Sequence, residues 1–194
     1  SVHKLKHLLS SFAPATVFDS AARSPLQTAR RVEARQYGMP VSPPDPEQLT
    51  ATIYSALSAR RPGETLTLQL VLGRTHGPQS VRPDAPDPLQ LVGSRLWYGI
   101  KKAAPETRRK LQEHASEPRL QVALRIGVDS PKSARREALI LGLFGSLQSL
   151  EAIGVQLRLV PESPTELHHG SPKHARLDLT ARELTPLLGW PLGE

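Results

Sequence analysis

The chain has 194 residues and a formal net charge of +7, with a pI near 10.1. It contains no cysteine, which excludes a disulfide scaffold and any zinc or iron–sulfur site ligated by cysteine. The longest apolar run, Ala138–Leu147, is shorter than the roughly 20 residues that cross a bilayer.

The positive charge favours anionic partners, namely nucleic acid, acidic proteins or a membrane face. The abundance of Arg, Ala, Leu and Pro is also typical of a high-GC genome, which would explain part of the charge without any function. The chain shows no signal peptide. We expect a cytoplasmic domain, and association with a membrane through a longer parent protein stays open.

Residues 1–46 are expected to form an N-terminal appendage of helices and extended chain. An apolar stripe at helical spacing predicts a first helix, formed by Val2, Leu5, Leu8, Leu9 and Phe12. Ser24 as N-cap and Pro25 in the first turn predict a second helix over residues 24–35. Residues 37–46 are expected to be extended, because four of them precede prolines.

Residues 47–179 are expected to form the main domain. A helix begins at Asp45–Pro46 and ends at Pro62–Gly63. Strict alternation of apolar residues predicts three strands, at residues 65–72, 119–128 and 155–160. Helices are predicted over residues 105–115 and over residues 130–154, the second with Ser130 as N-cap. A Pro-rich insertion over residues 74–97 is too long for an ordinary loop and is expected to be an excursion with structure of its own, or a mobile flap.

These elements predict an α+β fold. The strand, long helix and strand after residue 118 form a βαβ unit. We expect a ferredoxin-like sandwich with helices on one face of a mainly antiparallel or mixed sheet, a polar opposite face, and the N-terminal helices added. Ala13–Phe18 and Ala175–Leu179 are the candidates for a fourth strand. In residues 180–194, Thr180 and Glu183 form a capping box at the start of a last helix.

Signatures of catalysis are missing from the sequence. It has no phosphate-binding P-loop, no G-x-S-x-G elbow and no H-E-x-x-H helix. We therefore predict no catalytic residue, no cofactor and no metal site, and expect no binding of ATP. His168, His169 and His174 are close in sequence, but a solvated polar loop is favoured over a metal site. His3 and His7 are interpreted as surface residues.

One group of basic residues stands out among the scattered basic pairs. Lys132, Arg135 and Arg136 lie in the first turns of the long helix, where the helix dipole disfavours cations. They are the candidate contact for an anion or DNA, and the alternatives are a solvated face or contact with an acidic neighbouring subunit. Replacing all three by Ala is expected to leave stability unchanged or slightly raised.

Three short runs of residues in this chain match a pattern seen in a known class of protein. They are "SP--ARR-AL" from Ser130, "G--LRLV" from Gly154 and "EL--LL-WPLG" from Glu183. Together they resemble the region just upstream of the motor in actinobacterial type IV secretion and conjugation ATPases of the HerA–FtsK superfamily, akin to TraG/TraD coupling proteins. The resemblance implies that residues 180–194 lead as a helix and linker toward a motor domain that begins after Glu194.

The leading hypothesis is therefore a non-catalytic accessory domain of a DNA- or protein-translocating ATPase. The partners that the resemblance implies are other subunits of the parent ATPase in a homo-oligomer, or other secretion components. DNA is a further candidate partner, and no small-molecule substrate is expected. The alternative is a free-standing basic α+β module that binds nucleic acid. An enzyme of unrecognised type has no constellation of acid, base and nucleophile to support it.

Overall fold

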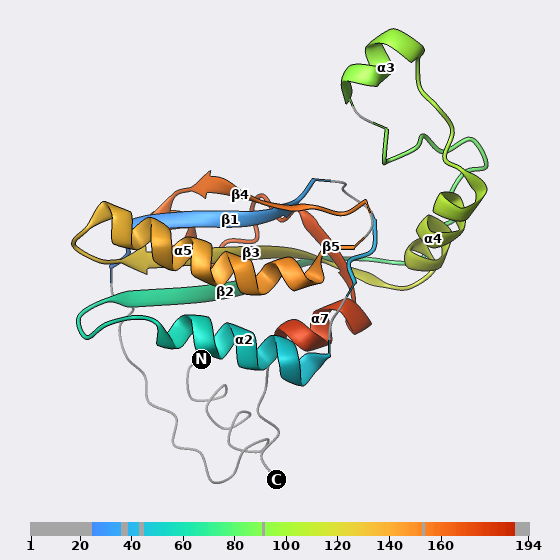
Figure 1. Ribbon diagram of the computed structural model, residues 1–194. Coiled ribbons are helices and arrows are strands. Elements are labelled where there is room, and N and C mark those ends of the chain that lie inside the picture. Colours follow the sequence, from blue (N-terminus) through green and yellow to red (C-terminus); the bar gives the residue numbers. More distant parts are fainter. Residues whose placement is uncertain (1–24, 36–38, 43–44, 91, 153, 189–194) are drawn as a thin grey trace, which may run out of the picture.

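The computed structural model describes residues 25–35, 39–42, 45–90, 92–152 and 154–188. Within these residues, five strands form one sheet with helices around it (Figure 1). The strands are β1 (Thr28–Ala34), β2 (Thr65–His76), β3 (Arg119–Asp129), β4 (Leu157–Glu162) and β5 (Leu177–Thr180). The helices are α2 (Pro46–Ser58), α3 (Val92–Tyr98), α4 (Pro105–Ala115), α5 (Ser133–Leu147), the short 3₁₀ helix η1 (Gln148–Leu150), α6 (Pro164–His169) and α7 (Ala181–Leu188).

The sheet has the strand order β2-β3-β1-β4, and all neighbouring strands are antiparallel. Helix α2 connects β1 to β2, and helix α5 connects β3 to β4. In each case the two connected strands are parallel and one other strand lies between them. Two interleaved split βαβ units result, as in ferredoxin-like folds. The predicted α+β class with a mainly antiparallel sheet is confirmed.

Strand β1 contradicts the helix predicted over residues 24–35. It lies between β3 and β4, paired with both, so ladder hydrogen bonds on its two sides outweigh the local helix-start signal of Ser24 and Pro25. Residues 28–34, expected in the N-terminal appendage, are thus part of the sheet. The first predicted helix and the candidate strand Ala13–Phe18 lie outside the described residues.

The other candidate for a fourth strand, Ala175–Leu179, corresponds to β5. It pairs with the first residues of β3, Arg119–Val122, whereas β1 pairs with Leu124 to Val128. Strand β2 occupies the opposite edge of β3 along its length. Strand β3 therefore contacts three strands, and its residues from Val122 to Val128 are buried.

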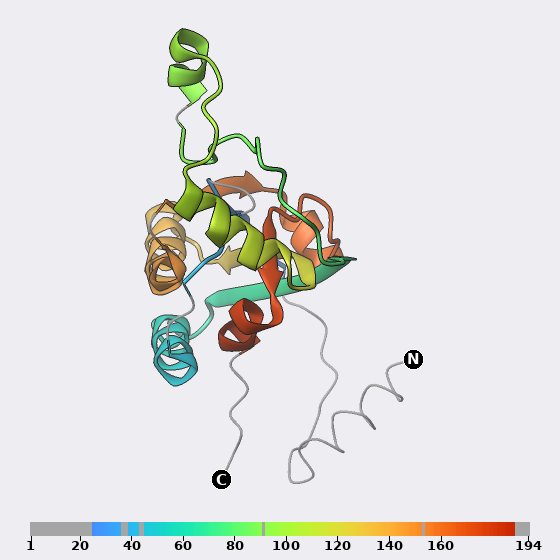
Figure 2. The same ribbon diagram turned by 90° about the vertical axis from the view of Figure 1, so that its right-hand side faces the viewer.

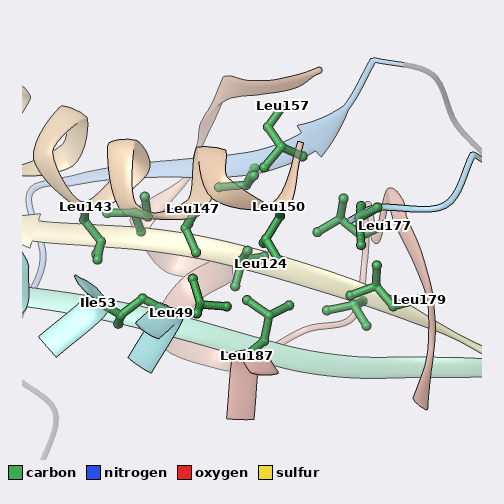
Figure 3. Close-up of a cluster of buried hydrophobic side chains, with 14 of the residues drawn as sticks. Leu49, Ile53, Leu124, Leu143, Leu147, Leu150, Leu157, Leu177, Leu179 and Leu187 are labelled. Carbon is green, nitrogen blue, oxygen red and sulfur yellow. The ribbon is translucent and has the colours of Figure 1, made fainter. Parts of the chain in front are cut away.

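The apolar core lies between the sheet and a layer formed by α2, α5 and α7 (Figure 3). Helix α2 contributes Leu49 and Ile53, and helix α5 contributes Leu143 and Leu147. Leu187 closes the layer from α7. Helix α5 begins two residues later than predicted, because Ser130 does not cap it; the Ser130 hydroxyl instead donates to Glu64 Oε1 at 2.9 Å. It also ends earlier than predicted, at Leu147 rather than at a cap formed by Gly154.

The opposite face of the sheet carries polar side chains, as predicted, and it is also partly covered. Helix α6 packs there, and Gln69 on β2 donates from Nε2 to the Leu167 carbonyl at 2.8 Å. Gly127 on β3 makes this approach possible: a Cβ at this position would lie 2.6 Å from Leu26 and 2.8 Å from Leu167. The core helices α2, α5 and α7 thus cover one face as expected, and α6 is one short helix added on the polar face.

The predicted excursion is present and has structure of its own. Strand β2 runs on to His76, past a bulge between Leu72 and Thr75, so the irregular chain begins at Gly77 rather than at Arg74. It extends as an arm that carries α3 away from the sheet and returns to α4 (Figures 1 and 2). Among the described residues, no helix is both long enough and apolar enough to cross a membrane.

Candidate functional site

The three predicted cations at the start of α5 do not form one exposed group. Lys132 is the N-cap residue and is exposed. Arg135 is half-buried against Glu64, with Nε 3.2 Å from Oε1 and Nη2 3.2 Å from Oε2. Arg135 Nη2 also donates to the Ala59 carbonyl at 2.6 Å. The carboxylate of Glu64 therefore offsets the unfavourable position of Arg135 near the positive end of the helix dipole.

Arg136 connects the start of the fold to the start of α5. Its Nη1 donates to the Ser130 carbonyl at 2.6 Å and to Gln27 Oε1 at 2.7 Å. Its Nε donates to Thr28 Oγ1 at 3.1 Å. Because Arg135 and Arg136 satisfy these groups, removing both should lower stability, opposite to the expectation from the sequence. Of the three, Lys132 alone extends fully into solvent.

Glu64 is the acidic partner of this cluster. The hydrogen bond from Arg135, followed by the Arg61 backbone N–H, lowers the pKa of Glu64 from 4.5 to about 2. A hollow of about 630 Å³ lies over these residues, lined also by Lys132 and the loop at Pro62–Gly63. The exposed side chains of Arg61 and Lys132 are therefore the cations available to an external anion here.

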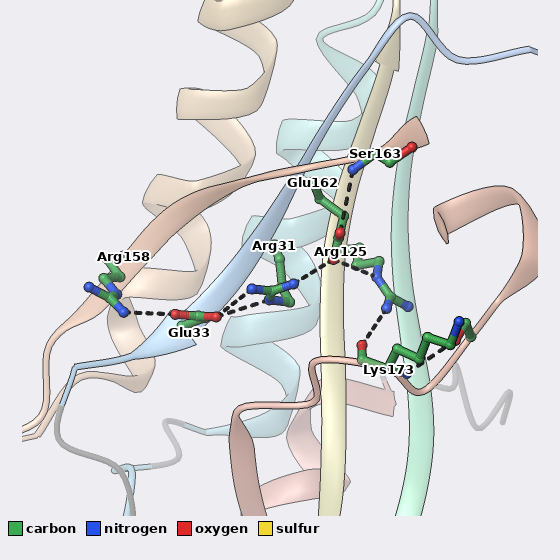
Figure 4. A network of polar contacts seen from close by, with 8 residues as sticks. Arg31, Glu33, Arg125, Arg158, Glu162, Ser163 and Lys173 are labelled. Carbon is green, nitrogen blue, oxygen red and sulfur yellow. Dashed lines mark hydrogen bonds and ion pairs between the residues drawn. The ribbon is translucent and has the colours of Figure 1, made fainter. Parts of the chain in front are cut away.

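A buried ion network on the polar face of the sheet was missed by the sequence analysis (Figure 4). Arg31 donates from Nε and Nη2 to Glu33 Oε1, at 3.0 and 2.6 Å, and from Nη1 to Glu162 Oε2 at 2.7 Å. Arg125, which is completely buried, donates to the same Glu162 oxygen at 3.4 Å and to the Lys173 carbonyl at 2.9 Å. At the solvent-exposed end of the network, Arg158 donates to Glu33 Oε2 at 2.9 Å.

The network holds Glu33 in the charged state. Burial alone would raise the pKa of Glu33, but hydrogen bonds from Arg31 and Arg158 outweigh it, so this pKa is lowered. Burial likewise acts to lower the pKa of Arg31, yet the two carboxylates raise it. Groups that keep their charge are poor proton donors and acceptors, so we interpret the network as structural. The alternation in each strand predicted polar side chains here, but not which strands would be neighbours.

A second buried pair lies where α4 meets α7. His114 Nε2 is 3.0 Å from Glu183 Oε2. Glu183 also accepts from the Val41 backbone N–H at 2.8 Å and the Thr180 N–H at 2.7 Å, and Thr180 Oγ1 accepts from the Glu183 N–H at 3.4 Å. The predicted capping box is therefore confirmed. The pair forms one wall of a hollow of about 430 Å³, whose other charged residues are Lys110, Glu113, Glu117 and Arg182.

Nothing in the local pattern indicated His114, which is 69 residues from Glu183 in the sequence. Because the Glu183 oxygens already accept two backbone N–H bonds, this carboxylate is better placed to join segments than to transfer protons.

The predicted histidine loop is divided between α6 and the segment that follows. His168 and His169 end α6, and His174 follows Gly170 in a backbone conformation with φ of 59°. Within the described ranges, no three His, Cys, Asp or Glu side chains are grouped in a way that could hold a metal ion. His3 and His7 fall outside the described residues.

Comparison with known proteins gives no relative for this chain. No family model, no curated protein and no solved structure matches it.

Proposed function

We propose that this chain is a non-catalytic accessory domain of a DNA- or protein-translocating ATPase of the type IV secretion and conjugation class, and that it contributes to assembly. The sequence runs at Ser130, Gly154 and Glu183 that resemble this class support the proposal. The buried ion pairs support it as well, because their charged groups serve the fold and are not free for proton transfer.

The observation that carries the proposal is the outward surface of α2 and α5, named here the α2–α5 face. Helix α2 contains one charged residue, Glu47, in its first turn, and the charges of α5 also end within its first turns, at Glu137. Beyond them the exposed positions are uncharged, and all but Gln48 are apolar or small: Gln48, Ala51, Thr52, Tyr54, Ser55, Ser58, Ala138, Leu141, Gly142 and Gly145.

Contact with a neighbouring subunit would explain this composition. Tyr54 is 52% and Leu141 53% exposed, and burying the remaining half of such a side chain contributes about 1 kcal/mol. Gly142 and Gly145 have open space where a Cβ would stand, so another helix could approach closely. The two helices are fixed to each other by the Ser146 hydroxyl, which donates to the Thr52 carbonyl at 3.2 Å.

The test places a charge in the middle of the α2–α5 face. Leu141→Glu should prevent oligomer formation by the ATPase that contains this domain, measured by sedimentation velocity. The matched control is Thr165→Glu, the same change in charge on α6 across the sheet, which should leave oligomers intact. The assembly role is contradicted if both variants assemble like the wild type. The family assignment is contradicted separately if no P-loop is encoded downstream of Glu194, or if calorimetry shows saturable ATP binding by this chain.

One observation favours the alternative, a basic module that binds nucleic acid. Arg61 and Lys132 both border the 630 Å³ hollow and extend into solvent. The double variant Arg61→Ala, Lys132→Ala leaves the Arg135 and Arg136 contacts intact. If DNA binds here, this variant should weaken duplex binding and reduce the slope of log affinity against log salt by about two contacts. Identical binding curves would exclude this hollow as the DNA contact.

A further inference from the structure

The end of the arm exposes the most apolar surface of the described residues. Leu96, Trp97, Tyr98 and Ile100 are 84, 85, 78 and 72% exposed, and they occupy four of the five positions 96–100, with Gly99 as the fifth. We call these four side chains the arm tip. Figures 1 and 2 show α3 at the far end of the arm, away from the sheet and the core helices. Apolar surface displayed in this way marks a site of interaction.

Hydrogen bonds between the outgoing and returning segments of the arm hold its shape. Its two strands of chain are joined by hydrogen bonds from the Ala103 N–H to the Ala85 carbonyl and from the Asp87 N–H to the Lys101 carbonyl, both 2.9 Å. Gln90 closes the loop, donating to the Gly99 carbonyl at 2.8 Å and accepting from the Lys101 N–H at 2.9 Å. These bonds keep the arm tip from folding back onto the core.

The arrangement around α3 indicates the kind of partner. Adjacent helical residues point about 100° apart, so Leu96, Trp97 and Tyr98 surround the helix rather than forming one stripe. A protein groove takes a stripe at i, i+3 and i+4, whereas a lipid phase accepts apolar side chains on every side. Trp and Tyr are the residues that favour the membrane–water interface.

Basic residues complete the pattern. Lys101 and Lys102 are exposed directly after the arm tip, where they would meet headgroups once the tip enters the bilayer. Lysines next to an apolar anchor are attracted by anionic lipids, within a Debye length of the surface. An element that lies in the membrane–water interface is buried only about 5–10 Å deep, which a helix as short as α3 can reach without crossing the membrane.

We propose that the arm tip is a peripheral membrane-binding site. Leu96, Trp97, Tyr98 and Ile100 enter the interfacial region of a bilayer that contains anionic lipid, and Lys101 and Lys102 contact its headgroups. A single site of this size gives weak, reversible binding, so several copies in one assembly would bind far more firmly than one. This inference does not depend on the proposed function.

The test measures partition of the whole chain onto vesicles of phosphatidylcholine, with or without about one quarter phosphatidylserine. The chain should float with the anionic vesicles. Trp97→Ala should weaken partition about tenfold, because it removes the largest inserted side chain. Leu72→Ala, which removes an exposed apolar side chain from β2, outside both the arm and the α2–α5 face, is the matched control and should partition like the wild type.

A second pair of variants separates the contribution of the lysine charges to vesicle binding from that of the inserted apolar side chains. Lys101→Glu with Lys102→Glu should remove the preference for phosphatidylserine, whereas Lys132→Glu with Lys173→Glu, the same change in charge away from the arm, should reduce it far less. Absence of vesicle binding overturns the proposal, as does binding that Trp97→Ala leaves unchanged. Self-association that requires Trp97, with no vesicle binding, would also overturn it and assign the arm tip to a protein contact.

Discussion

Arg31 is the residue on which the polar face of the sheet depends. It bonds two buried carboxylates, Glu33 and Glu162, while its own side chain is 10% exposed. Arg158 bonds the same Glu33, but its side chain is 59% exposed. The two arginines thus belong to one network, but Arg31 is buried and Arg158 is exposed to water. Comparing their variants therefore separates the effect of burial from that of charge.

Arg31→Ala should lower the free energy of unfolding by about 3–5 kcal/mol, because it leaves buried carboxylates short of a partner. Arg158→Ala should cost less than about 1 kcal/mol, since water replaces an exposed cation. Urea denaturation of both variants measures the difference. Equal losses for the two would contradict the structural role assigned to the buried end of the network.

The free energy of unfolding should depend on pH through Glu64. Between pH 4.5 and about 2, the unfolded chain binds a proton at this carboxyl that the folded chain does not bind. Its contribution is therefore present above pH 4.5 and is lost as the pH falls through this window. In urea titrations, Glu64→Gln should be less stable than the wild type at pH 7, and the gap should close toward pH 2. A gap that stays constant with pH would show that Glu64 is not ionised in the cluster.

At the scale of elements, two glycines should respond in opposite ways to the same substitution. Gly127→Ala should cost about 1–3 kcal/mol, because the new methyl group would collide with Leu26 and Leu167 and push α6 from the sheet. Gly142→Ala, on the solvent side of α5 with open space around it, should gain about 0.5–1 kcal/mol from helix propensity. Thermal unfolding would reveal the sign of each change, and a gain at Gly127 would contradict the tight approach of α6.

Elements with a strong internal period could be predicted from the sequence. Strands β2 and β3 and helices α2 and α4 lie where alternation, prolines and apolar stripes indicated, because those patterns are local. Strand β1 could not be predicted, since its conformation depends on pairing with β3 and β4, far along the chain. Ser130 illustrates the same limit, because its predicted capping role gave way to Glu64, 66 residues away.

The candidate site was predictable to a smaller degree. The sequence identified the basic start of α5, but the partners of Arg135 and Arg136 come from the loop after α2, the start of β1 and the end of β3. These partners convert two of three cations into structural contacts. The arm tip carries no periodic pattern, and its exposure follows from the stem that holds it away from the core, which no local signal reveals.

At the scale of the whole molecule, the arm and the sheet should be separable. Leu89, at the base of the arm, leaves no room for a side chain at Gly154, and Arg108 on α4 donates to the Pro83 carbonyl at 3.1 Å. Replacing residues 92–100 by a short Gly-Ser turn keeps both contacts. The melting temperature should shift by less than about 4 °C, as expected for under 1 kcal/mol in a chain of this size. A larger drop would show that α3 supports the core.

The central position of β1 has a consequence for synthesis. Arg31 on β1 and Glu162 on β4 are 131 residues apart in the sequence, so β1 waits for both neighbours while the ribosome makes most of the chain. At about 5–20 residues per second, this delay is on the order of 10 seconds. Distant pairings of this kind give high contact order and slow folding. Until β3 is made, β1 offers two unpaired edges, and until β4 follows it still offers one, so a nascent chain stalled before β4 is expected to be prone to aggregate.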